Sequence, residues 1–138
     1  MKTRLHSHRH ALQIMESVTE YRVLLQEISQ AISGLTDEAL IEHFEQKFQG
    51  KPTKSLSRSI NDLLDDALVA MQWAPQSQIF GDSDYGNHTW RLDFAKQAML
   101  TETNQKGEQA QTVSGVSVEV AFNHQGNIAW NLLKPVIA

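Results

Sequence analysis

The spacing of the apolar residues changes once along the chain, near Pro75. Before this point apolar residues recur every three or four positions, which is typical of helices buried on one face. After it, the clearest segment alternates apolar and polar residues, which is typical of a strand. In a chain of 138 residues, this change predicts one domain of the α/β (α+β) class. We expect a helical part over residues 1–74 and a strand-rich part over residues 75–138.

Three helices are expected in the first part. The first covers residues 11–32, and Gly34 follows it, a residue type that commonly ends helices. Thr36 is the expected N-cap of a second helix over residues 36–48, and a third helix is expected over residues 57–73. The apolar stripe of the first helix consists of Leu12, Met15, Val18, Tyr21, Leu24, Leu25, Ile28 and Ile32. This unbroken stripe predicts a single continuous helix.

Two strands are expected in the second part. A short one covers residues 89–96, and the strongest alternation in the chain covers residues 116–122. Between the helices and the first strand, residues 76–90 are rich in Gly, Asp, Ser and Asn and are expected to form a loop. Residues 101–115 are polar and almost without apolar side chains, so we expect a loop or a hairpin connection there.

The end of the sequence predicts a turn followed by another helix. Residues 123–127 read as a turn, and residues 128–138 begin an apolar, helical segment that Pro135 would kink or end. A sheet of only two strands with one helix is marginally stable. We therefore expect the sheet to be completed beyond residue 138 or by a partner.

Composition excludes several classes of protein. The net charge is −4, which argues against a protein that coats nucleic acid through a generally basic surface. The chain has no cysteine, so it has neither disulfides nor thiolate metal sites. No apolar run in the sequence reaches the length of a membrane span. A nucleic-acid enzyme stays compatible with this composition, because its positive charge can be local and its acids can bind metal.

Asp93 and Glu119 are the acids of the two expected strands, and each lies on the polar side of its own strand. If the strands pair, both carboxylates can reach one face of the sheet. Two close carboxylates repel each other, and Mg²⁺ relieves the repulsion because it prefers oxygen ligands, commonly one or two carboxylates with phosphate and water. Such a pair suits a metal-dependent phosphodiesterase. Outward acids are also common on strands, so the spacing alone leaves both interpretations open.

Other acidic and histidine clusters have simpler explanations. Asp82 and Asp84 resemble the start of a calcium loop, but the twelfth position is Asp93 rather than Glu, and a turn explains them better. The histidines of "HSHRH" at residues 6–10 suit a terminal tail. The sequence contains no Walker loop and no G-x-G-x-x-G motif, and its spacing does not assemble a Ser/His/Asp set.

Basic and polar residues occur near two of the expected element ends. Lys51, Lys54 and Arg58 flank the start of the third helix, where the helix N-terminus can help to bind phosphate. A solvated surface explains the same residues. Asn123 and His124 follow the second strand directly, where they either form a turn or lie beside the acids. In the second case His124 can orient a water molecule or contact phosphate.

At "WRLDFAK" and "GVSVEVAF" the sequence resembles the BglII/BstYI family of type II restriction endonucleases, which have the PD-(D/E)XK nuclease fold. The resemblance is closest over residues 55–138. It implies magnesium-dependent cleavage of double-stranded DNA at a short palindromic site by a homodimer in the prokaryotic cytoplasm. It also implies that Asp93 and Glu119 are catalytic metal ligands, with the backbone carbonyl of Val120 as a further ligand.

The sequence departs from this family at the third residue of the motif. That residue is Lys in most of the superfold and Gln in BglII-like enzymes, whereas here it is Ala121. A neighbour has to take its role, and the candidates are His124, Asn123 and Lys96. The connection between the two acids is also longer than the short hairpin expected of the family. The residues predicted to contact DNA are Asn123, Lys96, Lys54 and Arg58, and His124 joins the catalytic candidates.

Two other functions stay open on the sequence alone. Ala121 suits a degenerate nuclease-fold module that binds DNA or a protein partner without cleaving. A small interaction domain with two incidental acids is the third alternative. Metal binding that depends on both acids separates a nuclease from a degenerate module. The interaction domain predicts carboxylates that lie far apart, too far to bind one Mg²⁺ at about 2.1 Å from each ligand.

Overall fold

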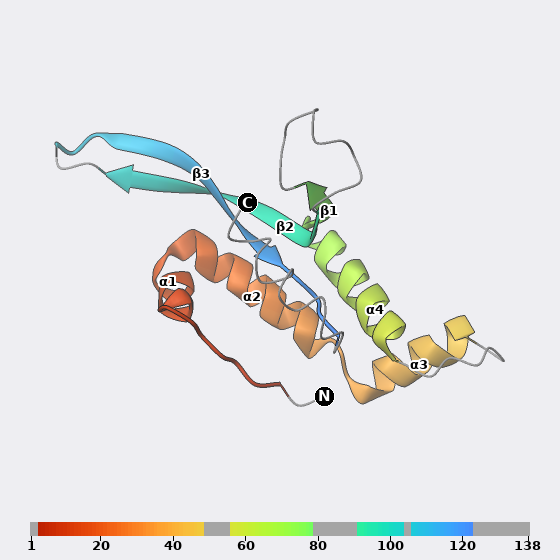
Figure 1. Cartoon of the computed structure of the whole chain (residues 1–138). Coiled ribbons are helices and arrows are strands. Elements are labelled where there is room, and N and C mark those ends of the chain that lie inside the picture. The colour runs from red at the N-terminus through yellow and green to blue at the C-terminus, as the bar shows by residue number, and fades with distance from the viewer. Residues whose placement is uncertain (1–2, 49–55, 79–90, 104–105, 123–138) are drawn as a thin grey trace. The chain divides into compact units, whose positions relative to one another are not determined.

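The computed structural model describes residues 3–48, 56–78, 91–103 and 106–122 (Figure 1). The chain divides into two compact units, Met1–Met71 and Gln72–Ala138. The boundary lies close to the change of period at Pro75. Helices fill the described part of the first unit and strands that of the second, so the predicted mixed α/β class is confirmed. No helix in the described ranges is long and apolar enough to cross a membrane.

The first unit contains two consecutive helices, α1 (Ala11–Ser17) and α2 (Thr19–Ser33), which a single residue separates. The prediction of one continuous helix over this segment is wrong. Val18 is extended, with φ −85° and ψ 120°, and it separates the two helices. Its β-branched side chain favours that conformation. The Arg22 Nε donates a hydrogen bond of 2.9 Å to the Glu16 carbonyl across the break, which satisfies a carbonyl near the end of α1.

The other two helices are α3 (Asp37–Phe48) and α4 (Ser57–Ala70). Thr36 caps α3 as predicted, since its Oγ1 accepts a hydrogen bond of 3.1 Å from the Ala39 N–H. Helix α4 contacts both α2 and α3, and the Lys47 Nζ lies 2.6 Å from the Asp62 Oδ2 between α3 and α4. The buried apolar residues of this unit are Leu24, Ala31, Leu35, Leu40, Phe48, Leu64 and Leu68.

The second unit contains a three-stranded antiparallel sheet in the order β1-β2-β3. The strands are β1 (Ala74–Gln78), β2 (Arg91–Thr103) and β3 (Gln109–Val118). Two predictions are wrong here. Residues 76–78, the start of the expected loop, belong to strand β1, and most of the expected connection at 101–115 is paired strand.

The physical reasons for both errors are visible in the sheet. Strand β1 lies at an edge of the described sheet, where Pro75 is tolerated because an edge strand needs fewer ladder hydrogen bonds. The polar connection forms a ribbon because cross-strand backbone pairing continues from Phe94↔Val118 to Thr103↔Gln109 without interruption. Gly107 lies in the turn with φ 81°, a conformation that favours glycine.

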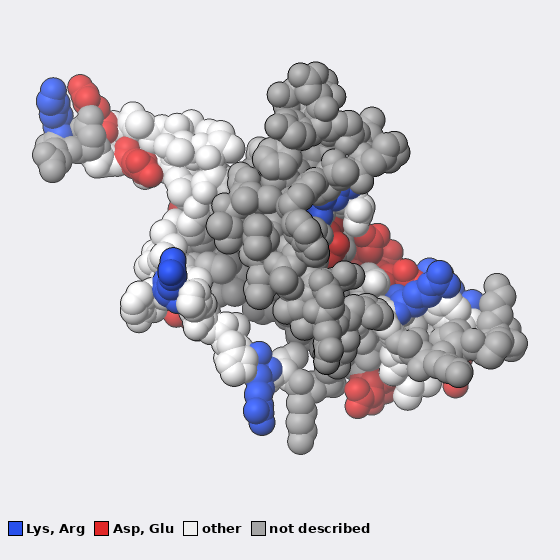
Figure 2. Space-filling view, viewed as in Figure 1, with Lys and Arg blue, Asp and Glu red and all other residues white. Residues whose placement is uncertain are grey.

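Strand β2 has one apolar face near its start. Leu92, Phe94 and Ala98 are buried and share this face, whereas Asp93 is half-buried and lies on the other one. Strand β1 pairs with β2 only as far as Ala95. Farther along, the β2–β3 ribbon is two-stranded and largely exposed in its described part, and acidic and basic side chains lie together at its far end (Figure 2).

Several predicted segments lie outside the described residues. They are the expected loop between β1 and β2 with Asp82 and Asp84, the turn at 123–127, and the expected helix at 128–138.

Candidate functional site

The structure brings Asp93 and Glu119 together where the β2–β3 ladder ends. Its last pair is Phe94↔Val118, so the next residues along the two strands are Asp93 and Glu119. Residues directly opposite each other in an antiparallel pair point to the same face. The Asp93 N–H donates to the Glu119 Oε1 at 3.4 Å, and the Val120 N–H donates to the Asp93 Oδ2 at 2.8 Å. Each acid therefore accepts a backbone hydrogen bond from the opposite strand.

These two hydrogen bonds explain why the sequence folds in this way locally. Strand β3 ends at Val118, and the Val120 N–H pairs with a carboxylate in place of a ladder carbonyl. The charged acceptor makes this bond stronger than a neutral one, while the bond to Glu119, at 3.4 Å, is weak. Both carboxylates are half-buried. The two bonds thus link the strands, and the shorter one fixes the direction of the Asp93 carboxylate.

The same arrangement offers ligands for a divalent cation. A carboxylate has two oxygens with about four lone-pair sites, so accepting one hydrogen bond does not use its whole capacity. No group of three or more His, Cys, Asp or Glu side chains that could hold a metal occurs among the described residues. Mg²⁺ commonly takes only one or two carboxylates and completes its shell with water and phosphate oxygens. The chemistry of this donor pair therefore fits Mg²⁺.

Among the remaining predicted site residues that the structure describes, Val120 contacts the acid pair. The Val120 backbone lies beside the Asp93 carboxylate, through its N–H at 2.8 Å. Lys96 lies on the face of β2 opposite Asp93, because the pairing from Phe94 onward contains no bulge. Arg58 is exposed in the first turn of α4. The residues Lys54, Asn123 and His124 lie outside the described part of the chain.

One residue beside the acids was missed by the sequence analysis. Arg91 begins β2 two positions before Asp93, so both side chains lie on the same face of the strand. It is half-buried, and its Nη1 donates to the Gln76 carbonyl of β1 at 3.4 Å. The R-x-D spacing was a signal for it. Only the register of β2 against β3 shows that this face also carries Glu119.

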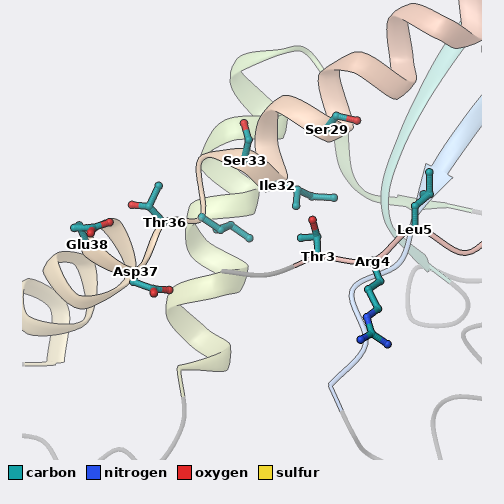
Figure 3. A pocket seen from close by; sticks show the side chains of 10 residues that line it. Thr3, Arg4, Leu5, Ser29, Ile32, Ser33, Thr36, Asp37 and Glu38 are labelled. Carbon is teal, nitrogen blue, oxygen red and sulfur yellow. The ribbon is translucent and has the colours of Figure 1, made fainter.

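Two hollows lie among the described residues of the helical unit, and neither is lined by a predicted site residue. One, of about 600 Å³, is lined by the N-terminal segment, the end of α2 and the start of α3 (Figure 3). Arg4 lies well apart from Asp37 and Glu38 in this view, so the hollow does not assemble its charged groups. The other, of about 640 Å³, is lined by residues of α2 and α4 together with neighbouring residues. The paired acids are the better candidate site.

Comparison with known families decides what kind of protein carries this acid pair. The model of the family described as restriction endonuclease BglII/BglIII matches residues 3–138. The chain belongs to this BglII/BglIII family. No curated protein and no solved structure gives a significant match. The resemblance drawn from "LDF" and "VEVAF" is confirmed, and the match extends it over the helical unit. Membership in this restriction endonuclease family implies a hydrolase that binds and cleaves DNA.

Proposed function

We propose that this BglII/BglIII family member is a magnesium-dependent type II restriction endonuclease. It hydrolyses phosphodiester bonds of double-stranded DNA at a short specific site, as a homodimer in the prokaryotic cytoplasm, with Asp93 and Glu119 as the metal ligands. The observation that carries the proposal is the reciprocal pairing of the two acids, since each carboxylate accepts a backbone N–H from the other strand.

The roles of the residues follow from this pairing. Asp93 and Glu119 bind the cation, and the Val120 N–H orients the Asp93 carboxylate. The Asp93 N–H makes only a weak bond to Glu119. The Val120 carbonyl is the proposed third protein ligand. Bound Mg²⁺ would polarise a phosphoryl oxygen and lower the pKa of a water. His124 is proposed to orient the attacking water or to contact the phosphate.

Cleavage of supercoiled plasmid DNA in Mg²⁺ tests this proposal. We expect Asp93→Ala and Glu119→Ala each to lower the cleavage rate at least about 100-fold, because loss of a metal ligand removes several kcal/mol of transition-state stabilisation. Glu102→Ala is the matched control, since Glu102 is an exposed acid at the far end of β2. If both site variants cleave as fast as this control, the assignment is wrong.

A second function is favoured by one specific observation. Ala121 occupies the motif position where the family has a polar residue, which suits a module that binds DNA or a protein partner without cleaving it. That function predicts binding of duplex DNA by the wild type with no cleavage in Mg²⁺ or Mn²⁺.

A further inference from the structure

The face of β2 that carries Asp93 continues along the β2–β3 ribbon. Side chains alternate between the two faces of a strand, and the pairing from Phe94↔Val118 to Thr103↔Gln109 contains no bulge. Residues opposite each other in this ladder share a face. The exposed pairs that follow Asp93 on its own face are Gln97↔Gly115, Met99↔Val113, Thr101↔Gln111 and Thr103↔Gln109. We call these four pairs the amide face.

The amide face carries no charged residue, although charged residues make up 20% of the chain. The opposite face of the same ribbon carries Lys96 and Glu102 and includes the buried Ala98. Carboxylates, which would repel phosphate, therefore do not occur on the amide face. Its polar groups are the amides and hydroxyls of Gln and Thr, which can both donate and accept hydrogen bonds.

The dimensions and residues of this surface suit a DNA groove. Strand β1 pairs with β2 only as far as Ala95, so the amide face belongs to the two-stranded part of the sheet (Figure 1). The major groove is about 12 Å wide and admits a two-stranded ribbon. Glutamine can bind adenine there through two hydrogen bonds, and apolar side chains can contact the thymine methyl group. The exposed pair Met99↔Val113 suits the second kind of contact.

We propose that the amide face lies in the major groove of the DNA that the acid pair cuts, where Gln97 and Gln111 contact base edges. The inference rests on the proposed nuclease function and names the surface that binds the DNA beside the cleaved bond. Duplex DNA is the occupant that family membership implies. DNA that reaches Asp93 also meets the surface that continues from it on the same face of β2.

The length of the ribbon sets where these contacts fall. Gln97 lies four positions after Asp93, and Gln111 pairs with Thr101, which lies eight positions after it. At about 3.3 Å per strand residue, these positions are about 13 Å and 26 Å from Asp93. Because one base pair spans about 3.4 Å of the duplex, the contacts fall about four to eight base pairs from the cleaved bond.

A second copy of this chain suits the amide face less well. Met99 and Val113 are its apolar side chains, and Gln and Thr residues surround them. A stable interface between two copies buries about 800 Å² on each partner around an apolar centre. One apolar pair among amides and hydroxyls supplies little of such a centre, whereas it matches the mixed polar and apolar edges of bases.

The test adds a negative charge to each face of the ribbon in the full chain. Thr101→Glu changes the amide face, and its matched control Thr112→Glu changes an exposed threonine of the opposite face. In EDTA, binding of a fluorescent plasmid-derived duplex should weaken at least about 10-fold in Thr101→Glu, because the new carboxylate would face the DNA. The control should bind like the wild type, and urea denaturation checks that both variants are folded.

Methylation protection locates the contact on the DNA. Guanine N7 lies in the major groove, so dimethyl sulfate modifies it unless protein covers it. The wild type should protect guanines about four to eight base pairs from the mapped cleavage position. A double variant, Gln97→Ala with Gln111→Ala, should lose this protection. Protection that persists in the double variant would overturn the assignment of these two residues.

The remaining outcomes separate this inference from the proposed function. Equal binding by Thr101→Glu and Thr112→Glu would overturn the inference, and the nuclease function would stand if Asp93→Ala were inactive. Sedimentation velocity without DNA tests the other occupant. If Thr101→Glu converts a wild-type dimer to a monomer, the amide face binds a second copy and the inference fails. Rapid cleavage by Asp93→Ala would overturn the proposed function, whereas weaker DNA binding by Thr101→Glu would still support the amide face.

Discussion

At the scale of single residues, the buried hydroxyl of Ser59 in α4 lowers the stability of the fold. Its relative exposure is 0%, and its Oγ has no hydrogen-bond partner in the described structure. A buried hydroxyl without a partner costs about 1–3 kcal/mol, and alanine is also the better helix former. We predict that Ser59→Ala raises the free energy of unfolding by about 1 kcal/mol, measured by urea denaturation.

Ser29→Ala is the matched control for this prediction. Ser29 is exposed in α2, and its Oγ donates to the Leu25 carbonyl at 2.8 Å. Its replacement loses this exposed hydrogen bond and gains helix propensity, so we expect stability to change by no more than a few tenths of a kcal/mol. A Ser59→Ala variant that is less stable than the wild type would show that the hydroxyl has a stabilising partner.

The residues of the site were predictable to different degrees. Asp93 and Glu119 were predicted from strand alternation and the motif, because both signals are local in sequence. The strand expected over residues 116–122 ends at Val118, one residue before Glu119. The hydrogen bond between the Val120 N–H and Asp93 depends on how two strands pair across 27 positions, and no local pattern encodes that register. The same limit applies to Arg91, whose neighbours are set by the pairing of β1, β2 and β3.

At the scale of elements, β2 and β3 come close together at Gly115. A Cβ added there would lie 3.0 Å from the Lys96 carbonyl oxygen, a backbone atom that cannot rotate away. We predict that Gly115→Ala lowers the free energy of unfolding by about 1–3 kcal/mol, as overpacking does. Because Gly115 precedes Glu119 on the same strand face, this variant should also slow plasmid cleavage.

Gly34→Ala serves as the comparison. Gly34 has φ −69° at the end of α2, and a Cβ there would come no closer than 3.4 Å to the Ala31 carbonyl oxygen. This replacement should raise stability by about 0.4–1 kcal/mol, since alanine has less conformational freedom when unfolded. Equal stability of the two variants, measured by thermal and urea denaturation, would contradict the close approach at Gly115.

The elements themselves were predicted where a regular apolar period marks them. Helices α3 and α4 appear close to their expected bounds because each buries one stripe. The period did not show the break at Val18, where the stripe continues across a single extended residue. Strand β1 and the far part of the β2–β3 ribbon were missed because they carry few apolar residues, and backbone pairing rather than burial identifies them.

At the scale of the whole molecule, family membership and charge constrain how DNA is bound. The chain has a net charge of −4, with 12 basic and 16 acidic residues, so phosphate contacts have to come from local clusters of basic side chains. The proposed homodimer predicts that a plasmid with one site is cut in both strands. Sedimentation velocity should show two chains per duplex. A monomer that leaves nicked circles as its main product would contradict the dimer.

Asp93 and Glu119 are proposed to form one metal site rather than only a pair of strand contacts. Calorimetric titration of Mg²⁺ into Asp93→Asn and Glu119→Gln tests this proposal. Each amide keeps an oxygen that can accept the backbone N–H, so the hydrogen bonds of 2.8 Å and 3.4 Å can persist while the charge is lost. We predict one Mg²⁺ site in the wild type and binding at least about 10-fold weaker in each variant. The free energy of unfolding in urea should change by no more than about 1 kcal/mol, because each hydrogen bond becomes a neutral one. Wild-type Mg²⁺ affinity in both variants would contradict the account.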